Sequence, residues 1–382
     1  MSSGVWPTVG TPAAPTQAAS LRLVLLGDGE SPHLLKWARA LAAEGVNLWA
    51  ASSRGFLPGF DEVLPTDRRL ALNTQPRFGG GNLQVLATLP RLARWLRQVR
   101  PDWLHAHYLT SHGTLGWLAQ AVGGVPGRLV GSAWGSDILV TPERHPLLRW
   151  LTRRVLRACT LTTSDSLHMA ARMQALGAAE VMTFPFGLDA LPPEATGKDD
   201  DLFFANRGLE AIYQPQRVIE VFAAIAARRP QARLVVANDG SLRPALEDQA
   251  RQAGLVERVR FVGRLAADEQ ARWYAQARWY LSLPASDSVS VSVLEAMAHG
   301  CVPLLSDLPA NRELVRSGDN GLVLADGALP DAAALQALLA KADAIASDNR
   351  AWVAGHALFQ PCVRRFLARL QALQAAGPCA AR

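Results

Sequence analysis

Two acidic residues eight positions apart, Asp287 and Glu295, mark the segment whose residue types and spacing most directly suggest chemistry. Ser, Val and Leu fill the interval, and a helix is predicted to begin near Ser292. The first turn of a helix presents unpaired N–H groups and the positive end of the helix dipole, which suits a diphosphate. An acid one turn into the helix can accept hydrogen bonds from vicinal hydroxyls, such as those of a ribose. The spacing therefore favours a nucleotide site, and the alternative is a buried helix capped by Asp287.

The elements around this segment alternate between short apolar runs and helical spacing, which is typical of parallel α/β folds. A polar stretch with Pro and Gly, residues 191–201, divides the alternation into two series and predicts a linker. The predicted strands are residues 21–26, 46–51, 103–107, 128–132 and 161–164 before the linker, and 202–205, 233–237, 259–262, 277–283 and 302–306 after it. The predicted helices include residues 31–44, 82–99, 146–157, 216–228, 293–300 and 361–375.

A chain of 382 residues is long enough for two domains. We predict two doubly wound, Rossmann-like domains that face one another across a cleft, with the ligand site at the carboxyl ends of their strands. The last helix is expected to cross back onto the first domain. The predicted divisions are a disordered tail (1–20), an N-terminal domain (21–190), a linker (191–201), a C-terminal domain (202–355) and a C-terminal helix and tail (356–382).

Composition restricts the location of the protein and the cofactors it could hold. Four cysteines without a CxxC pair argue against a zinc site or a disulfide framework. No apolar run approaches the roughly 20 residues of a membrane-spanning helix. The first 20 residues lack the basic start and apolar core of a signal peptide. We therefore expect a cytoplasmic protein.

The net charge of +6 allows anionic partners, and two predicted helices concentrate arginine on one face. Both helices could rest on anionic lipid at the inner face of a membrane. An ordinary solvated helix face is the interpretation that we favour. No aromatic–basic platform supports nucleic-acid binding. The arginines are Arg91, Arg94, Arg97 and Arg100 on one helix, and Arg144, Arg149, Arg153, Arg154 and Arg157, around Leu147 and Trp150, on the other.

The segment from Asp287 to Glu295 resembles the acid–x7–Glu signature of retaining glycosyltransferases of family 4, also called glycosyl transferases group 1, which have the GT-B fold. The resemblance extends from Leu21 to about Val363. Each motif alone is weak evidence for the family, but the whole set in this order along the chain is strong evidence. The other motifs are Ser31-Pro-His33-Leu-Leu-Lys36-Trp37, Pro101-Asp102 through His107, Pro185-Phe-Gly187-Leu-Asp189, Phe261-Val-Gly263-Arg264, Leu294-Glu-Ala-Met-Ala-His-Gly300 and Asn320-Gly321.

The resemblance implies a nucleoside diphosphate-sugar as co-substrate, bound by the C-terminal domain, and no required metal or other cofactor. Glu295 would hold the ribose hydroxyls, Arg207 would neutralise the leaving diphosphate, and Asp287 would touch the transferred sugar. His107 and Asp137 remain as candidates for acceptor contact in the N-terminal domain, and the five residues form the predicted catalytic set. The predicted donor-binding residues are Gly27, Gly29, Asn238, Gly240, Arg264, Val289, Ser290, Val291, Ser292 and Glu295, and the predicted acceptor-side residues are Trp134 and Ser136.

The sequence departs from the family pattern at three positions. Asp287 stands where Glu is usual, which concerns the identity of the sugar more than the reaction. The lysine that usually follows the arginine at Arg207 is absent, and Arg243 or Arg312 could share its role. Trp134 replaces a loop histidine, and a Trp can stack on a sugar but cannot move protons.

We therefore predict a retaining glycosyltransferase that moves a sugar to a hydroxyl of a glycan, a lipid-linked or a small-molecule acceptor. The alternative is a degenerate, non-catalytic protein of the same fold that binds nucleotide-sugars. A dinucleotide-dependent oxidoreductase is disfavoured, because Pro32 stands where the third glycine of the Gly27-Asp-Gly29 fingerprint should be.

Overall fold

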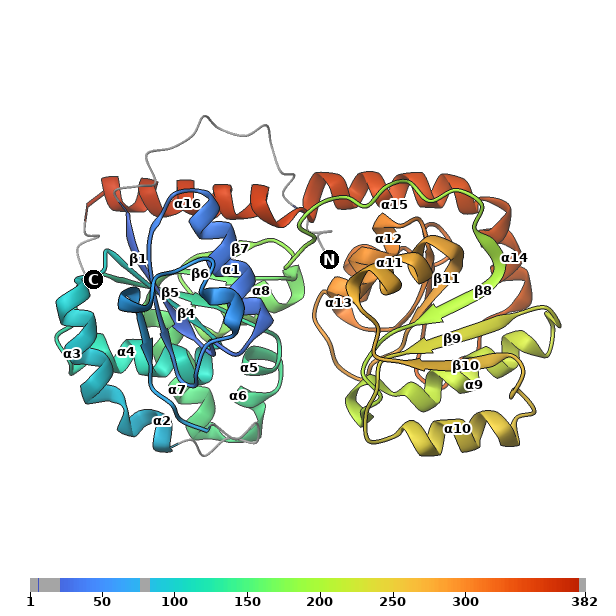
Figure 1. The fold of residues 1–382 in the computed structure, drawn as a ribbon, viewed down its shortest axis with the longest axis horizontal. Coiled ribbons are helices and arrows are strands. Elements are labelled where there is room, and N and C mark those ends of the chain that lie inside the picture. The colour runs from blue at the N-terminus through green and yellow to red at the C-terminus, as the bar shows by residue number, and fades with distance from the viewer. Residues whose placement is uncertain (1–5, 7–20, 76–82, 378–382) are drawn as a thin grey trace. The chain divides into compact units, whose positions relative to one another are not determined.

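The computed structural model describes residue 6, residues 21–75 and residues 83–377. The chain forms two compact units (Figure 1). Unit 1 contains the described residues up to Phe184 and those from Phe359 onward, and unit 2 contains Pro185–Leu358. The predicted N-terminal tail lies outside the described residues except for Trp6, which is buried.

Unit 1 is built on a seven-stranded sheet whose strand order is β3-β2-β1-β4-β5-β6-β7. All neighbouring strands run parallel. The central strands are buried on both faces, which explains why they read as continuous apolar runs in the sequence. The strands are β1 (Arg22–Gly27), β2 (Asn47–Ser52), β3 (Arg69–Ala71), β4 (Trp103–His107), β5 (Arg128–Ser132), β6 (Cys159–Ser164) and β7 (Val181–Thr183).

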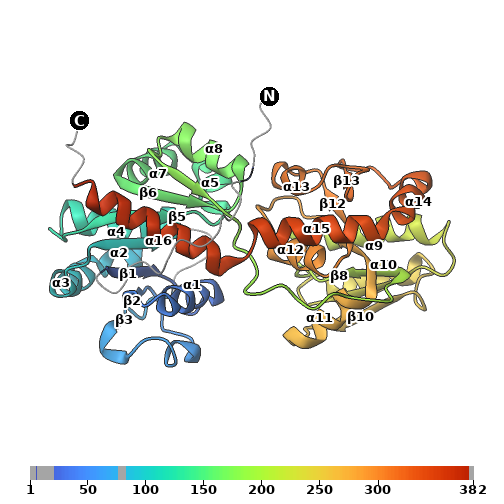
Figure 2. The same cartoon turned by 90° about the horizontal axis from the view of Figure 1, so that it is seen from above.

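Helices cover both faces of the unit 1 sheet. The apolar sides of α3, α4, α7 and α8 pack in one cluster on one face. On the other face lie α1 and α16, and Figure 2 shows α16 across the strands. The helices are α1 (Pro32–Ala43), α2 (Leu83–Ala87), α3 (Leu89–Val99), α4 (Thr114–Ala121), α5 (Ser136–Leu139), α6 (Thr141–Arg144), α7 (Pro146–Ala158), α8 (Leu167–Leu176) and α16 (Phe359–Ala375), with short turns η2 (Pro58–Phe60), η3 (Thr66–Arg68) and η4 (Leu109–Gly113).

The predicted return of the last helix onto the first domain is confirmed. Trp37 of α1 makes edge-on ring contacts with Phe359 and Phe366 of α16, at centroid distances of 5.1 and 5.3 Å. Arg369 of α16 also pairs with Glu180 at 2.6 Å. Unit 1 is therefore completed by a segment from the far end of the chain.

Unit 2 is built on a six-stranded parallel sheet with the order β10-β9-β8-β11-β12-β13. Both sheets together confirm the predicted α/β fold of two doubly wound domains. The strands are β8 (Asp199–Ala205), β9 (Arg233–Ala237), β10 (Val259–Gly263), β11 (Ala277–Ser282), β12 (Val302–Ser306) and β13 (Leu322–Leu324). The helices are α9 (Pro215–Ala226), α10 (Arg243–Gln252), α11 (Ala267–Gln276), α12 (Val291–Ala298), α13 (Pro309–Leu314), α14 (Ala332–Ala340) and α15 (Ala342–His356), with the turn η5 (Ala211–Tyr213).

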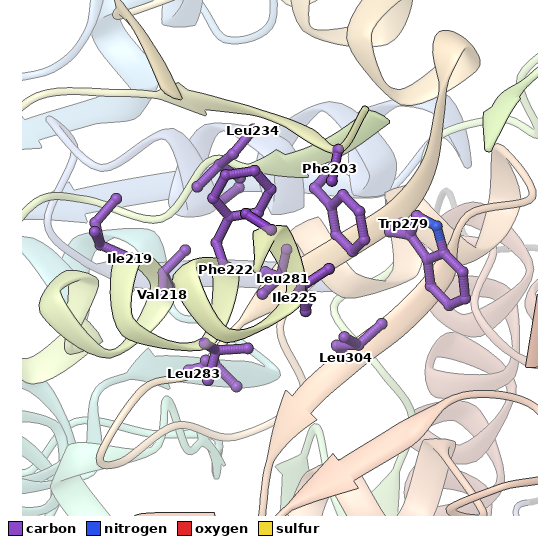
Figure 3. Packing of buried hydrophobic residues seen from close by; sticks show 14 of the residues in the cluster. Phe203, Val218, Ile219, Phe222, Ile225, Leu234, Trp279, Leu281, Leu283 and Leu304 are labelled. Carbon is purple, nitrogen blue, oxygen red and sulfur yellow. The ribbon is translucent and has the colours of Figure 1, made fainter. Parts of the chain in front are cut away.

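The core of unit 2 lies between the sheet and α9 (Figure 3). Phe222 of α9 meets Phe203 of β8 at a ring-centroid distance of 5.7 Å. Phe203 in turn stacks on Trp279 of β11 with an interplanar angle of 9°. These side chains fix the two central strands, β8 and β11, whose carboxyl ends carry the candidate site.

Two predictions about local structure are wrong. Asp199–Ala205 forms one strand, so the acids at 199–201 belong to β8 and not to a solvated linker. Each acid has an arginine partner: Asp199 pairs with Arg233, Asp200 with Arg278 and Asp201 with Arg229. These ion pairs neutralise the three charges and allow the acids to lie within the strand. The helix predicted at residues 82–99 is broken in two, with Thr88 between α2 and α3 and Pro90 in the first turn of α3.

Gly187 occupies a point of unit 2 where no side chain fits. A Cβ on Gly187 would lie 1.8 Å from the carbonyl oxygen of Ala357. We expect Gly187→Ala to lower the free energy of unfolding by about 3 kcal/mol, because the backbone must shift. Gly355→Ala is the matched control, since no atom lies within 4 Å of its added Cβ. Because Gly355 lies in α15, Gly355→Ala should raise the free energy of unfolding by about 0.5–1 kcal/mol. Urea unfolding measures the change in each variant. Equal changes in the two variants would contradict the close contact of Gly187 with Ala357.

Candidate functional site

Arg207, directly after β8, is the centre of a polar cluster at the carboxyl edge of the unit 2 sheet. Its Nη2 donates to Oδ2 of Asp287 at 2.6 Å. Its Nη1 donates to the hydroxyl oxygens of Ser290 and Ser292, the latter at 3.2 Å. The ring of Tyr213 lies against the guanidinium, with Cζ 4.5 Å from the ring centroid. The structure thus brings together Arg207, Asp287 and the two serines, which the family resemblance placed at one site.

The start of α12 positions the serines of this cluster. Ser290 is the N-cap residue with extended backbone angles, and its hydroxyl is 2.8 Å from that of Ser292. Neither hydroxyl caps the helix, because both lie at the guanidinium of Arg207. The cluster therefore combines the positive end of a helix dipole with a positive side chain, which is an environment for an anion.

The side chains of Arg207 and Asp287 are 18% and 24% exposed, so the pair is mostly removed from water. Burial raises the pKa of the Asp287 carboxyl, while the charge of Arg207 and the N–H of Ser288 lower it. An anion that approaches Arg207 must compete with the Asp287 carboxylate. The same competition frees that carboxylate to accept hydrogen bonds from another group.

Glu295 lies one turn into α12 and is held from α11. Tyr274 OH donates to Oε2 of Glu295 at 3.1 Å, and Nε2 of Gln270 donates to the same oxygen at 3.2 Å. Asn206, next to Arg207, donates to Tyr274 OH at 2.7 Å and accepts from Tyr280 OH at the same distance. The network fixes the direction of one carboxylate oxygen.

Tyr274, Gln270, Asn206 and Tyr213 contact predicted site residues but were not predicted. Tyr274 and Gln270 lie on α11, which approaches β11 and α12 only through the tertiary fold, whereas Asn206 and Tyr213 lie close to Arg207 in the sequence. One signal existed in principle, since a buried Tyr hydroxyl must find a hydrogen-bond partner. Burial raises the pKa of Tyr274 well above that of a free tyrosine, with further contributions from Tyr280 and Glu295. Tyr274 is therefore a neutral donor.

The other predicted donor residues of unit 2 are spread along the same edge of the sheet. Asn238, after β9, has a left-handed backbone (φ 79°) and contacts the carbonyl of Asn206. Gly240 approaches the backbone so closely that a Cβ would lie 2.4 Å from the carbonyl oxygen of Leu209. Arg264, after β10, is exposed. Val289 is buried beside Ser290, and Val291 begins α12.

The cations proposed as substitutes for the absent lysine are already engaged. Arg243 donates to Glu247 at 2.9 Å, and Arg312 pairs with Asp307. Lys198 is enclosed by carbonyls and donates to Tyr274 O and Ala277 O at 2.8 Å each. Arg207 is therefore the cation that the described residues place at the start of α12.

Unit 1 gathers its predicted residues at the carboxyl edge of its own sheet. Gly27 ends β1, His107 ends β4, and Trp134 follows β5. The rings of His107 and Trp134 meet edge-on at 5.7 Å. A Cβ on Gly27 would press on Leu34 at 2.9 Å, and one on Gly29 would lie 2.4 Å from the carbonyl of Gly55. Packing within unit 1 therefore requires a glycine at position 29, whereas at position 27 the ends of the Leu34 side chain could shift.

The histidines of β4 are buried and uncharged. His105 shares a hydrogen bond with Ser132 Oγ at 2.7 Å, and burial lowers its pKa to about 3. Among the described residues, neither ring nitrogen of His107 has a hydrogen-bond partner. Burial, and then its neighbours His105, His112 and His33, hold the pKa of His107 well below 6.5. His107 is therefore a neutral, buried group behind the ring of Trp134.

Asp137, a predicted candidate for acceptor contact, is held inside the fold of unit 1. It is fully buried, and its carboxylate accepts from the backbone N–H groups of Leu109 at 2.8 Å and Trp134 at 2.9 Å. These bonds tie the Trp134 loop to η4. Ser136 is exposed, and its hydroxyl lies 3.0 Å from Tyr108 OH. Trp134 and Ser136, not Asp137, are accessible on this loop.

Two family models match the chain in series. The model "Glycosyl transferase 4-like" matches residues 22–166, and "Glycosyl transferases group 1" matches residues 192–351. The second match contains Arg207, Asp287 and Glu295. The chain belongs to the group 1 glycosyl transferases. The similarity confirms the predicted family and its GT-B fold.

Curated relatives resemble the chain at low identity. The glycogen synthase of Mycobacterium tuberculosis is 27% identical over 332 residues, which cover 78% of the chain and 79% of the relative. An alpha-monoglucosyldiacylglycerol synthase of Streptococcus pneumoniae is 32% identical over 85 residues, which cover 22% of the chain and only 19% of the relative. The structure of Anabaena HepE in complex with UDP has a TM-score of 0.72 at 16% identity, covering 92% of the chain and 100% of HepE.

Side chains of the described residues form no group of three or more His, Cys, Asp or Glu suited to a metal ion. No helix in the described part of the glycosyl transferase is long and apolar enough to cross a membrane.

Acid should destabilise the folded chain. Burial lowers the pKa of His105 to about 3 and that of His112 to about 4, from 6.5 in the unfolded chain. The unfolded state therefore binds more protons below pH 6.5, and each of these histidines costs about 2 kcal/mol of stability between pH 6.5 and 5. Asp137 acts in the opposite sense, because burial raises its pKa to about 6, and its protonation offsets about 1 kcal/mol of this loss between pH 6 and 5.

Urea unfolding at pH 7, 6 and 5 measures this dependence. His112→Gln should reduce the slope, since an amide can keep the bonds to Ser53 Oγ and to the carbonyl of His107 without titrating. Stability that stays constant between pH 7 and 5 would contradict the neutral, buried histidines.

Proposed function

We propose that the chain transfers a sugar from a nucleoside diphosphate-sugar to a hydroxyl group, with retention of the anomeric configuration. The observation that carries the proposal is the position of Arg207 among Ser290, Ser292 and Asp287 at the start of α12, one turn before Glu295. We assign the donor to unit 2 and the acceptor to unit 1.

The diphosphate is proposed to bind beside Arg207, because a planar guanidinium can donate to two phosphate oxygens at once. The hydroxyls of Ser290 and Ser292 and the first N–H groups of α12 add further donors. The diphosphate takes the place of Asp287 at Arg207, and the released carboxylate accepts from hydroxyls of the transferred sugar. Glu295, held by Tyr274 and Gln270, accepts from the two ribose hydroxyls.

The reaction breaks the bond between C1 of the sugar and the diphosphate oxygen and forms a bond from C1 to the acceptor oxygen. The acceptor's proton passes to an oxygen of the leaving diphosphate. The proposal needs no protein base at this step, in keeping with the buried, neutral His107 and the Trp at position 134. Arg207 stabilises the negative charge that grows on the diphosphate, which is the largest contribution that we assign to the protein.

The acceptor is proposed to lie against Trp134, whose partly exposed ring can stack on a sugar face. The complexes of HepE with UDP and UDP-glucose support a nucleotide-sugar donor. The relatives include a synthase of a glucosyldiacylglycerol and glycogen synthases, and the proposed acceptor is a hydroxyl of a glycan, a lipid-linked or a small molecule.

A second candidate function follows from the ion pair between Arg207 and Asp287. Asp287 neutralises its charge, and no second cation of the described residues replaces the family lysine. A chain with such a site could bind nucleotide-sugars without turning them over.

Release of nucleoside diphosphate separates the two functions. The protein is incubated with UDP-glucose, GDP-mannose or ADP-glucose and simple glycoside acceptors, and proton NMR follows the anomeric signals. We expect nucleoside diphosphate and an α-linked product from one α-configured donor, with the same rate in EDTA. A β-linked first product would overturn retention, and a loss of activity in EDTA would overturn metal independence. Nucleotide binding without release would support the second candidate.

A further inference from the structure

Helix α7 of unit 1 exposes large apolar side chains beside arginines. Leu147 is 61% exposed and Trp150 is 50% exposed, although α7 buries Thr152, Val155 and Leu156 against the rest of unit 1. One face of α7 therefore packs on the core of unit 1, while Leu147 and Trp150 form a second apolar patch that is exposed to solvent. A patch of this kind beside basic residues is typical of a surface that meets a partner.

Four arginines of α7 surround this patch and are exposed: Arg149, Arg153, Arg154 and Arg157. None of them has an ion pair with a carboxylate among the described residues, in contrast to arginines of unit 2 such as Arg229 and Arg278. Arg154 lies over the ring of Trp150, with Cζ 5.6 Å from the ring centroid. The nearest acid in the sequence, Glu143, pairs with Arg172 of α8. The four guanidinium groups of α7 can therefore bind an anion from outside the chain.

The direction of α7 places its apolar end near the candidate acceptor site. A helix that connects parallel strands starts at their carboxyl edge and runs back to the amino edge. Leu147 and Trp150 lie in the first two turns of α7, and α5 and α6 link these turns to the Trp134 loop. The apolar patch is therefore at the same edge of unit 1 as Trp134, and the arginines continue along the helix.

We propose that α7 docks on the surface of an anionic phospholipid bilayer. Leu147 and Trp150 enter the boundary between headgroups and acyl chains, and the arginines meet lipid phosphates. Charge complementarity selects this occupant, because a second copy of α7 would set four unpaired arginines against four others. On the same face of the sheet, α3 adds the exposed Arg91 and Arg94. The inference is independent of the donor site in unit 2.

Flotation of the full chain with vesicles tests the proposal. Vesicles of phosphatidylcholine alone are compared with vesicles of phosphatidylcholine and phosphatidylglycerol in equal parts. We expect binding to the anionic vesicles only, and weaker binding as salt is raised. Arg149→Gln with Arg153→Gln should lower the partition coefficient about 25-fold, at about fivefold for each arginine. Trp150→Ser should lower it while leaving the salt dependence unchanged.

The matched control is Arg228→Gln with Arg260→Gln, which removes the same charge from exposed positions of unit 2. It should change the partition coefficient by less than about twofold. Thermal unfolding and nucleotide binding of all variants are measured in parallel and should match the unmodified chain. No binding to anionic vesicles, or an equal loss in the control pair, would overturn the proposal. A dimer that Trp150→Ser disrupts, without vesicle binding, would assign the patch to a second copy instead.

Discussion

Replacement of Glu295 by alanine is expected to lower kcat/KM for the nucleotide-sugar about 100- to 1,000-fold. The carboxylate is the proposed acceptor for two ribose hydroxyls, and a hydrogen bond to a charged group contributes about 1.5–3 kcal/mol. The effect should be mainly on the KM of the donor, because both the ground state and the transition state contain the ribose. Steady-state kinetics with the donor identified by nucleotide release measures the change.

Two variants make the Glu295 prediction specific. Glu257→Gln removes an exposed carboxylate of unit 2 and should leave the kinetics unchanged. Tyr274→Phe removes the hydroxyl that directs Oε2 of Glu295 and should raise the donor KM about tenfold, with little effect on kcat. Near-normal kinetics of Glu295→Ala would show that the ribose is bound elsewhere.

Replacement of Arg207 by alanine should have the opposite signature, a loss in kcat of about 100- to 1,000-fold. The guanidinium is proposed to meet charge that grows only as the bond to the diphosphate breaks. Arg207→Lys should recover part of the rate, since lysine restores the charge but not the planar fork. Rapid-quench turnover, or steady-state rates at saturating donor, measures kcat directly.

Arg243→Gln is the control for Arg207, because Arg243 is near the same edge of the sheet but is paired with Glu247. Its kcat should stay within about threefold of the unmodified value. If Arg243→Gln and Arg207→Ala lost activity equally, both arginines would stabilise the negative charge of the diphosphate. If Arg207→Ala kept its kcat, the proposed role of the guanidinium would be wrong.

Much of the fold could be predicted from the sequence, because buried parallel strands appear as short apolar runs between helices. One error occurs where tertiary ion pairs override local signals, and the other where a local helix breaker interrupts the apolar spacing. Asp199, Asp200 and Asp201 resemble a linker in sequence, yet arginines from neighbouring elements neutralise them within β8. The break between α2 and α3 follows from a proline at residue 90, which the helical spacing of apolar residues does not reveal.

The residues of the candidate site also include some that could be predicted from the sequence and some that could not. Arg207, Asp287, Ser290 and Ser292 could be predicted, because they match motifs of the family that the sequence resembles. Tyr274 could not, since nothing along the chain connects α11 to α12. Gln270 of α11 falls in the same class, whereas Tyr213 lies only six residues after Arg207 in the sequence.

Asp137 shows what a motif does not reveal. The family's Gly-x-Asp loop made it a candidate for acceptor contact, while the structure shows its buried carboxylate bound by backbone N–H groups of Leu109 and Trp134.

The central claim is that unit 2 binds a nucleoside diphosphate between Arg207 and Glu295. Thermal unfolding in the presence of UDP, GDP or ADP tests it most directly. A ligand at about 100 times its Kd stabilises the folded state by about 2.7 kcal/mol, which raises Tm by several degrees. We predict such a rise with one of the three nucleotides, absent in both Arg207→Ala and Glu295→Ala. No rise with any nucleotide, or an equal rise in the variants, would contradict the account.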